Sequence, residues 1–158
     1  MYQRILVPID GSPTAERGLA EAIKLGRLTG AQLRLIHVVD ELSFALSASQ
    51  GMTVTMSGDM LDILREAGTE ILAQGAASVR AAGLQVDTVL KDSFAGRVSD
   101  LVVNEAGAWP ADLIVLGTHG RRGVGRLFLG SDAETIVRSA PVPVLLLRAA
   151  ATTTTAPE

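Results

Sequence analysis

Residues 113–131 read LIVLGTHGRRGVGRLFLGS, and they carry the clearest structural signal in this chain. An apolar run of strand length comes first and a glycine-rich stretch follows it. A helical pattern then begins at Ser131, with Glu134 three residues on, which is the spacing of a capping box. A strand that leads through a loop into a helix is one unit of an α/β fold. The sequence therefore predicts a strand, a loop and a capped helix, in this order.

Four further apolar runs of similar length flank this unit: Ile5–Ile9, Leu33–Val39, Val86–Leu90 and Val142–Leu147. Most of the runs are nearly unbroken by polar residues, which is typical of parallel strands buried on both faces. The run QVDTVL alternates more, so we expect it at an edge of the sheet. Helical patterns separate the runs, and strict alternation implies parallel strands joined by right-handed crossovers. We therefore expect an α/β fold with a doubly wound sheet.

Start signals place the expected helices. Ser12 before Pro13 is typical of an N-cap followed by the first helical residue. The second helix should begin near Ser57 or Asp59, the third near Gly96, and the fourth at Ser131. Trp109 should pack where the third helix meets the fourth strand.

Two segments fit no periodic template. We expect residues 43–57 to be a mobile insertion and residues 150–158 to be a disordered tail, after a single domain over residues 1–149.

Composition excludes several classes of protein. The chain has 158 residues, no cysteine, a formal charge of −3 and 3% aromatic residues. Without cysteine there is no disulfide framework and no thiolate metal site. Mild acidity and few aromatic side chains argue against nucleic-acid binding. No signal peptide and no apolar stretch of roughly 20 residues is present, so we expect a cytoplasmic protein without a membrane association.

A ligand is expected beyond the carboxyl ends of the strands, because open α/β sheets bind ligands where the strand order reverses. The segment 117–131 lies after one strand and holds five glycines and three arginines. Glycines let backbone N–H groups approach an anion, and a helix N-terminus adds donors and partial positive charge. Together they predict a phosphate cradle. It matches neither the Walker loop nor the dinucleotide fingerprint.

At this segment the chain resembles the universal stress protein family. The pattern G-x2-G-x9-G-[ST] is filled by Gly117, Gly120, Gly130 and Ser131. The stretches ILVPIDGS, HVVD, ADLIVLGTHGR and APVPVLLLR also look like family signatures, and the resemblance covers about Tyr2 to Arg148. It implies a three-layer, five-stranded parallel sheet in the order 3-2-1-4-5, similar to the adenine nucleotide alpha-hydrolases.

The resemblance also implies a ligand and a site. The ligand would be ATP or a related adenine nucleotide with Mg²⁺, held by a regulatory stress-response protein with little or no hydrolysis. Asp10 would lie beside the nucleoside and Pro8 would shape the same loop, while the backbone at Val38 would meet the adenine. Ribose and phosphates would be held by the remaining residues: Gly117, Gly120, Gly130 and Ser131. Relatives of this kind form homodimers through the last strand, here Val142–Leu147.

Two residues of the glycine-rich region are ambiguous. Arg121 is a candidate phosphate contact, although loop arginines are often only solvated. Asp132 stands where the family usually has an apolar residue. Its carboxylate favours the helix dipole but would repel a phosphate. A divalent cation could screen it, it could point away, or phosphate affinity could be lower.

Structural roles compete with these site assignments. Asp10 could simply end its strand, Ser131 could only cap a helix, and the glycines could only serve turns. His37 is expected to be a hydrogen-bonded core histidine, and Asp40 and Glu41 to face solvent.

Two other functions stay open. One is a dimeric interaction module of the same fold that binds no nucleotide. The other is an adenylating or sulfur-transfer enzyme, but PIDGSPTAER matches neither a HIGH-type nor an SGGxDS-type motif. No base for phosphoryl transfer can be named, so no catalytic residue is assigned.

Overall fold

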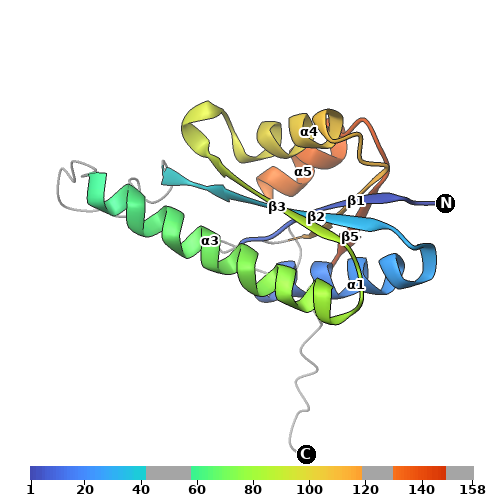
Figure 1. The fold of residues 1–158 in the computed structure, drawn as a ribbon. Coiled ribbons are helices and arrows are strands. Elements are labelled where there is room, and N and C mark those ends of the chain that lie inside the picture. The colour runs from blue at the N-terminus through green and yellow to red at the C-terminus, as the bar shows by residue number, and fades with distance from the viewer. Residues whose placement is uncertain (42–57, 119–129, 149–158) are drawn as a thin grey trace, which may run out of the picture.

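The computed structural model describes residues 1–41, 58–118 and 130–148. Its centre is one five-stranded parallel sheet in the order β3-β2-β1-β4-β5 (Figure 1). The strands are β1 (Arg4–Pro8), β2 (Gln32–Val39), β3 (Val86–Asp92), β4 (Leu113–Gly117) and β5 (Val144–Leu147). The doubly wound sheet and its strand order are therefore confirmed. The expected insertion at 43–57 and the expected tail at 150–158 lie outside the described residues.

Helices cover both faces of the sheet and complete three layers. The helices α1 (Pro13–Thr29) and α3 (Gly58–Ala81) lie on one face, and α4 (Val98–Ala108) and α5 (Ser131–Ser139) lie on the other (Figure 1). A short 3₁₀ turn, η1 (Ser93–Ala95), follows β3. None of the described helices combines the length and the apolar character that a bilayer crossing requires.

The inner strands contribute side chains to the hydrophobic cores on both faces of the sheet. Ile5 and Val7 of β1 belong to the core under α1 and α3, whereas Leu6 between them belongs to the core under α4 and α5. This alternation follows from the two-residue period of a strand. β3 pairs only with β2 and none of its residues is fully buried, so its expected place at an edge is confirmed.

Two element boundaries differ from the expectation. β5 begins at Val144 rather than Val142. Pro143 lies between them and has no N–H to donate to a strand partner, although its carbonyl accepts from Ile114 at 3.0 Å. α4 begins at Val98 rather than near Gly96, because Gly96 has φ of +146° and cannot be part of a right-handed helix.

An ionic cluster joins α4 to the edge of the sheet. The Arg34 guanidinium of β2 contacts Glu105 Oε1 at 2.8 Å and Asp87 Oδ2 at 3.1 Å. It also stacks over the Trp109 ring, 4.6 Å from the ring centroid. Trp109 ends α4 just before β4, so its predicted place at this junction is confirmed. The cluster fixes α4 across two strands and leaves the other end of the sheet for a ligand.

Candidate functional site

The site expected from the sequence lies where β1 and β4 end. These two strands pair in parallel at the centre of the sheet, with Ile5 opposite Leu113 and Leu6 opposite Ile114. The chain leaves β1 into α1 on one face, and reaches α5 from β4 on the other face (Figure 1). The strand order therefore reverses between β1 and β4, which is where open α/β sheets bind ligands.

The turn after β1 is held by its own side chains. Asp10 Oδ1 accepts a hydrogen bond from the Ser12 N–H at 2.9 Å, and Gly11 between them has φ of +76°. Ser12 Oγ then accepts from the Ala15 N–H at 3.2 Å, which confirms Ser12 as the N-cap of α1. Asp10 thus has a structural role in an Asx-type turn. In this turn the hydrogen bond to Oδ1 fixes the orientation of the Asp10 carboxylate, two residues after Pro8.

The first turn of α1 rests directly on the end of β4. A Cβ atom on Gly117 would lie 2.7 Å from the carbonyl oxygen of Thr14, closer than real Cβ contacts come. From the other side, a Cβ atom on Gly18 would lie 3.5 Å from the Gly117 nitrogen, which is ordinary contact. Gly117 is therefore required for packing, whatever its role toward a ligand. This packing brings the Asp10 turn next to the start of the glycine-rich segment.

The two ends of the glycine-rich segment meet in the structure. The Thr118 N–H donates to Leu147 O at 2.9 Å, and the Gly130 N–H donates to Thr118 O at 2.8 Å. The chain therefore departs from β4 and returns to α5 at one place. Gly120 and Arg121 lie between these points, outside the described residues, so their predicted phosphate contacts stay predictions.

The cap of α5 differs from the expectation. Gly130 is the N-cap, with φ of −59° and ψ of +147°, and it supplies no side-chain hydrogen bond. Ser131 is the first helical residue, so its prediction as a capping residue was wrong. The Thr118–Gly130 hydrogen bond sets the cap one residue earlier. Glu134 makes an ion pair with Arg138 at 2.7 Å rather than a capping box.

The amino end of α5 has the properties of an anion site. The N–H groups of a helix's first turn have no partner within the helix. No side chain of Gly130 covers them, and the helix dipole adds partial positive charge there. Ser131 and Asp132 are both exposed at this end. The Asp132 carboxylate favours the dipole but adds negative charge where a phosphate would approach.

Val38 lies on the other side of β1 from this helix end. The register between β1 and β2 ends at the pair Pro8–Ile36, so β2 continues beyond its neighbour. The Ile36 carbonyl faces β1, because it accepts from the Ile9 N–H at 2.9 Å. Residues two apart in a strand direct their backbone groups to the same side. The backbone of Val38 therefore faces the place beyond the end of β1, as a contact with a planar base requires.

Glu41 was missed by the sequence analysis. It was expected to face solvent, but its side chain is buried, with 1% of its surface exposed. Glu41 Oε2 accepts from the Ser93 hydroxyl at 2.7 Å, and the backbone N–H of Glu41 donates to Ser93 Oγ at 3.2 Å. Its Oε1 is buried without a hydrogen-bond partner in the part of the chain that the structure describes. The contact joins residues 52 positions apart, so no local pattern could have indicated it.

His37 and Arg65 make two further contacts near the carboxyl ends of the strands. His37 is buried and its Nδ1 lies 2.8 Å from Ile9 O, which confirms it as a hydrogen-bonded core residue. Arg65 of α3 contacts both carboxylate oxygens of Asp92 at 3.2 Å, and these hydrogen bonds raise the pKa of Arg65 above its usual range. An arginine is charged at any physiological pH, so this pair provides no pH switch.

Residues 1–41, 58–118 and 130–148 contain no preformed set of metal ligands. Within these ranges, no three His, Asp or Glu side chains are grouped so that they could hold an ion.

Known proteins resemble the chain over nearly its whole length. The model of the Universal stress protein family matches residues 1–148. Universal stress protein MJ0531 of Methanocaldococcus jannaschii is 30% identical over 148 residues, which are 94% of this chain and 83% of that protein.

Solved structures agree with the fold. The hypothetical protein MJ0577 superposes with a TM-score of 0.81 at 24% identity, covering 96% of this chain and 99% of that one. A universal stress protein in complex with cAMP has a TM-score of 0.66, and one from Archaeoglobus fulgidus in complex with dAMP has 0.64. Each of these two is 24% identical and covers 92% of this chain and 97% of its own. At this identity the superpositions show a common fold.

Proposed function

The chain belongs to the universal stress protein family, and on this premise we propose that it binds an adenine nucleotide where β1 and β4 end. The nucleoside lies between the Asp10 turn and the backbone of Val38, and the phosphates lie at the amino end of α5. The protein acts as a regulator of the stress response, with ATP as the leading ligand and Mg²⁺ bound through the phosphates. A cytoplasmic location belongs to the same proposal.

One observation carries the proposal: the Gly130–Thr118 hydrogen bond brings the amino end of α5, whose cap residue Gly130 makes no side-chain hydrogen bond, to the carboxyl end of β4. Such a helix end stabilises an anion without any positive side chain. The Thr14–Gly117 packing holds the Asp10 turn against the same strand. Complexes of two similar folds with cAMP and dAMP support an adenine base and at least one phosphate as the parts that are recognised.

Little or no hydrolysis is part of the proposal. Rapid phosphoryl transfer needs a cationic clamp on the phosphates and a group that positions the nucleophile. Asp10 is already engaged by the Ser12 N–H, and Asp132 lies on the helix that would hold the phosphates. Asp10 is proposed to lie beside the nucleoside, so neither carboxylate is proposed as the group that positions the nucleophile. The protein would therefore keep its nucleotide bound without hydrolysing it, and the bound nucleotide would act as the regulatory signal.

Calorimetry and thermal unfolding with ATP, ADP, cAMP and adenosine test this function. A ligand at 100 times its Kd stabilises the folded state by about 2.7 kcal/mol, which is a rise in Tm of roughly 5–10 °C for a chain of this size. Gly130→Ala should reduce the rise, because the new methyl group lies at the helix end, only 3.3 Å from Thr118 O. Gly107→Ala is the matched control, since nothing lies within 4 Å of its Cβ position.

Asp10→Asn tests the nucleoside side of the site. An asparagine can still accept from the Ser12 N–H, so the turn is preserved while the charge is removed. Binding of adenosine should weaken if the carboxylate accepts from the ribose. Equal adenosine affinity in the variant would show that Asp10 does not contact the nucleoside. The phosphate part of the site would then be tested separately by Gly130→Ala.

An interaction module without a nucleotide is the competing function. The Asp132 carboxylate at the helix end favours it, because the charge opposes a phosphate. No stabilisation by any of the four ligands at millimolar concentration would support it over the nucleotide site. Dimerisation through the last strand is common to both functions. Sedimentation of a Leu146→Lys variant, changed in a half-buried edge strand, tests it.

A further inference from the structure

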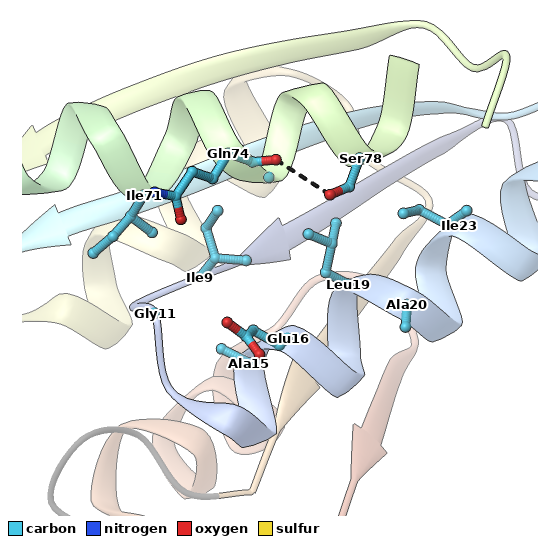
Figure 2. Close-up of a pocket in the computed structure, with 11 residues that line it drawn as sticks. Ile9, Gly11, Ala15, Glu16, Leu19, Ala20, Ile23, Ile71, Gln74 and Ser78 are labelled. Atoms are coloured by element: carbon cyan, nitrogen blue, oxygen red, sulfur yellow. Dashed lines mark hydrogen bonds between the residues drawn. The ribbon is translucent and has the colours of Figure 1, made fainter. Parts of the chain in front are cut away.

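We propose that the groove between α1 and α3 is a second ligand site, for a small organic cation with an apolar body. The groove has a volume of about 480 Å³, within the range of roughly 300–1,000 Å³ that is typical of ligand sites. It meets the β1–α1 turn at Gly11 and continues along α1 as far as Ile23 (Figure 2). None of the described candidate nucleotide-site residues lines it, and the two sites adjoin only at Ile9 and Gly11, which flank Asp10.

The floor of the groove is apolar and fixed. Ile9 and Leu19 lie in the core with 7% and 8% of their surfaces exposed, and Ile71 packs against the same core from α3. Gly75 lets α3 lie close to the sheet, since a Cβ atom there would come within 2.9 Å of Leu35 Cδ1 and 3.0 Å of Ile9 Cδ1. The floor is therefore set by packed core side chains and offers an apolar ligand a surface that is already formed.

The space above this floor is open because the facing side chains are short. Ala15 and Ala20 line it from α1, and Ser78 lines it from α3 (Figure 2). The Ser78 hydroxyl donates to the Gln74 carbonyl at 3.2 Å, so it is turned toward its own helix. A ligand with an aromatic or aliphatic body would fill this volume and cover the part of the apolar floor that still contacts water.

The polar groups that line the groove select a cation. Glu16 is the only charged residue among the eleven described residues that line it. The Gln74 amide nitrogen donates to Glu70 Oε1 at 2.8 Å. Figure 2 shows the amide oxygen of Gln74 directed toward the space between the helices. A carboxylate and an amide oxygen both accept hydrogen bonds, so an ammonium or guanidinium group is complementary to them.

Three probes with one apolar body test this assignment: 4-phenylbutylammonium, 4-phenylbutanol and 4-phenylbutyrate, titrated into the ¹⁵N-labelled protein and followed by NMR. The ammonium should bind most tightly and the carboxylate most weakly, with saturable shifts at the amides of Leu19, Ala20 and Ile71. Glu16→Gln should weaken the ammonium by about two- to fivefold, as expected for one exposed charge. Glu66→Gln, an exposed carboxylate of α3 outside the groove, is the matched control.

Variants that fill the groove with larger side chains provide a second test of the proposal. Ala20→Phe and Ser78→Leu change exposed positions on opposite walls, and either should abolish ammonium binding while adenosine binding is retained. The proposal is overturned if the ammonium gives no saturable shifts, if the three probes bind equally, or if both filled variants bind as the parent does. Because adenosine is measured on the same samples, a failure here is distinguishable from a failure of the nucleotide site.

Discussion

The carbonyl oxygen of Thr14 lies only 2.7 Å from the position that a Cβ atom on Gly117 would take. A glycine that a nucleotide-binding pattern singles out is thus also the contact between α1 and β4. The packing of the first helix and the path of the chain toward the proposed phosphate site depend on the same residue. Loss of ligand binding in a Gly117 variant would therefore not by itself identify a ligand contact.

We expect Gly117→Ala to lower the free energy of unfolding by about 1–3 kcal/mol, because overpacking forces the backbone of α1 away from β4. Gly18→Ala is its control from the facing helix. There the Cβ has ordinary contact at 3.5 Å and alanine favours a helix, so stability should be unchanged or higher by up to ~1 kcal/mol. Urea denaturation compares the midpoints. Equal destabilisation of the two variants would contradict the close contact.

Two serines that look alike in the sequence should behave differently. Ser12→Ala removes the cap of α1 and should cost about 1 kcal/mol of stability. Ser131→Ala should cost less than ~0.5 kcal/mol, because Ser131 is an exposed first helical residue and caps nothing. Thermal unfolding of both variants without ligand is the measurement. A comparable loss for Ser131→Ala would restore it as a capping residue.

Local patterns in the sequence were sufficient for the element order. Apolar runs such as Ile5–Ile9 predicted the positions of the strands, and the alternation around Val86 indicated a strand at the edge of the sheet. The order of the strands came from the resemblance to a family, since alternation alone permits several doubly wound orders. Ser12 was found because a cap is a local contact.

The errors at Gly130 and Glu41 arose where distant residues meet, whereas the shifted starts of β5 and α4 have local causes at Pro143 and Gly96. The cap at Gly130 depends on Thr118, twelve positions earlier, and the burial of Glu41 depends on Ser93. The α1–α3 groove is likewise a product of how two helices are spaced by the sheet. Such contacts depend on the packing of the whole domain, and no periodicity in the sequence encodes them.

Asp132 gives a test of charge at the proposed phosphate site. Asp132→Asn should raise the affinity for ATP in EDTA by about two- to tenfold, because it removes repulsion within the first turn of α5. Adenosine affinity should be unchanged, as adenosine has no phosphate. If Mg²⁺ screens the carboxylate, the gain should shrink when Mg²⁺ is added. An ATP affinity that is the same with and without the substitution, in both conditions, would mean that the carboxylate is directed away from the ligand.

The buried Glu41–Ser93 contact makes a prediction about stability at the carboxyl end of β2. Ser93→Ala removes the hydroxyl that donates to Oε2, and Oε1 already has no partner among the described residues. A buried carboxylate left in this state should cost about 1–3 kcal/mol. Glu41→Gln in the same background should recover part of that loss, since a neutral amide is less costly to bury than a charge.

A double-mutant cycle over Ser93→Ala and Glu41→Gln measures this coupling by urea denaturation. Residues in direct contact show interaction energies of about 0.5–3 kcal/mol, whereas independent sites are additive within about 0.5 kcal/mol. Ser99→Ala is the control, a buried serine in the first turn of α4, and it should be additive with Glu41→Gln. Additivity of the Ser93 and Glu41 changes would show that burial of the carboxylate does not depend on the serine. The end of β2, whose Val38 backbone is proposed to meet the base, would then be held by other contacts.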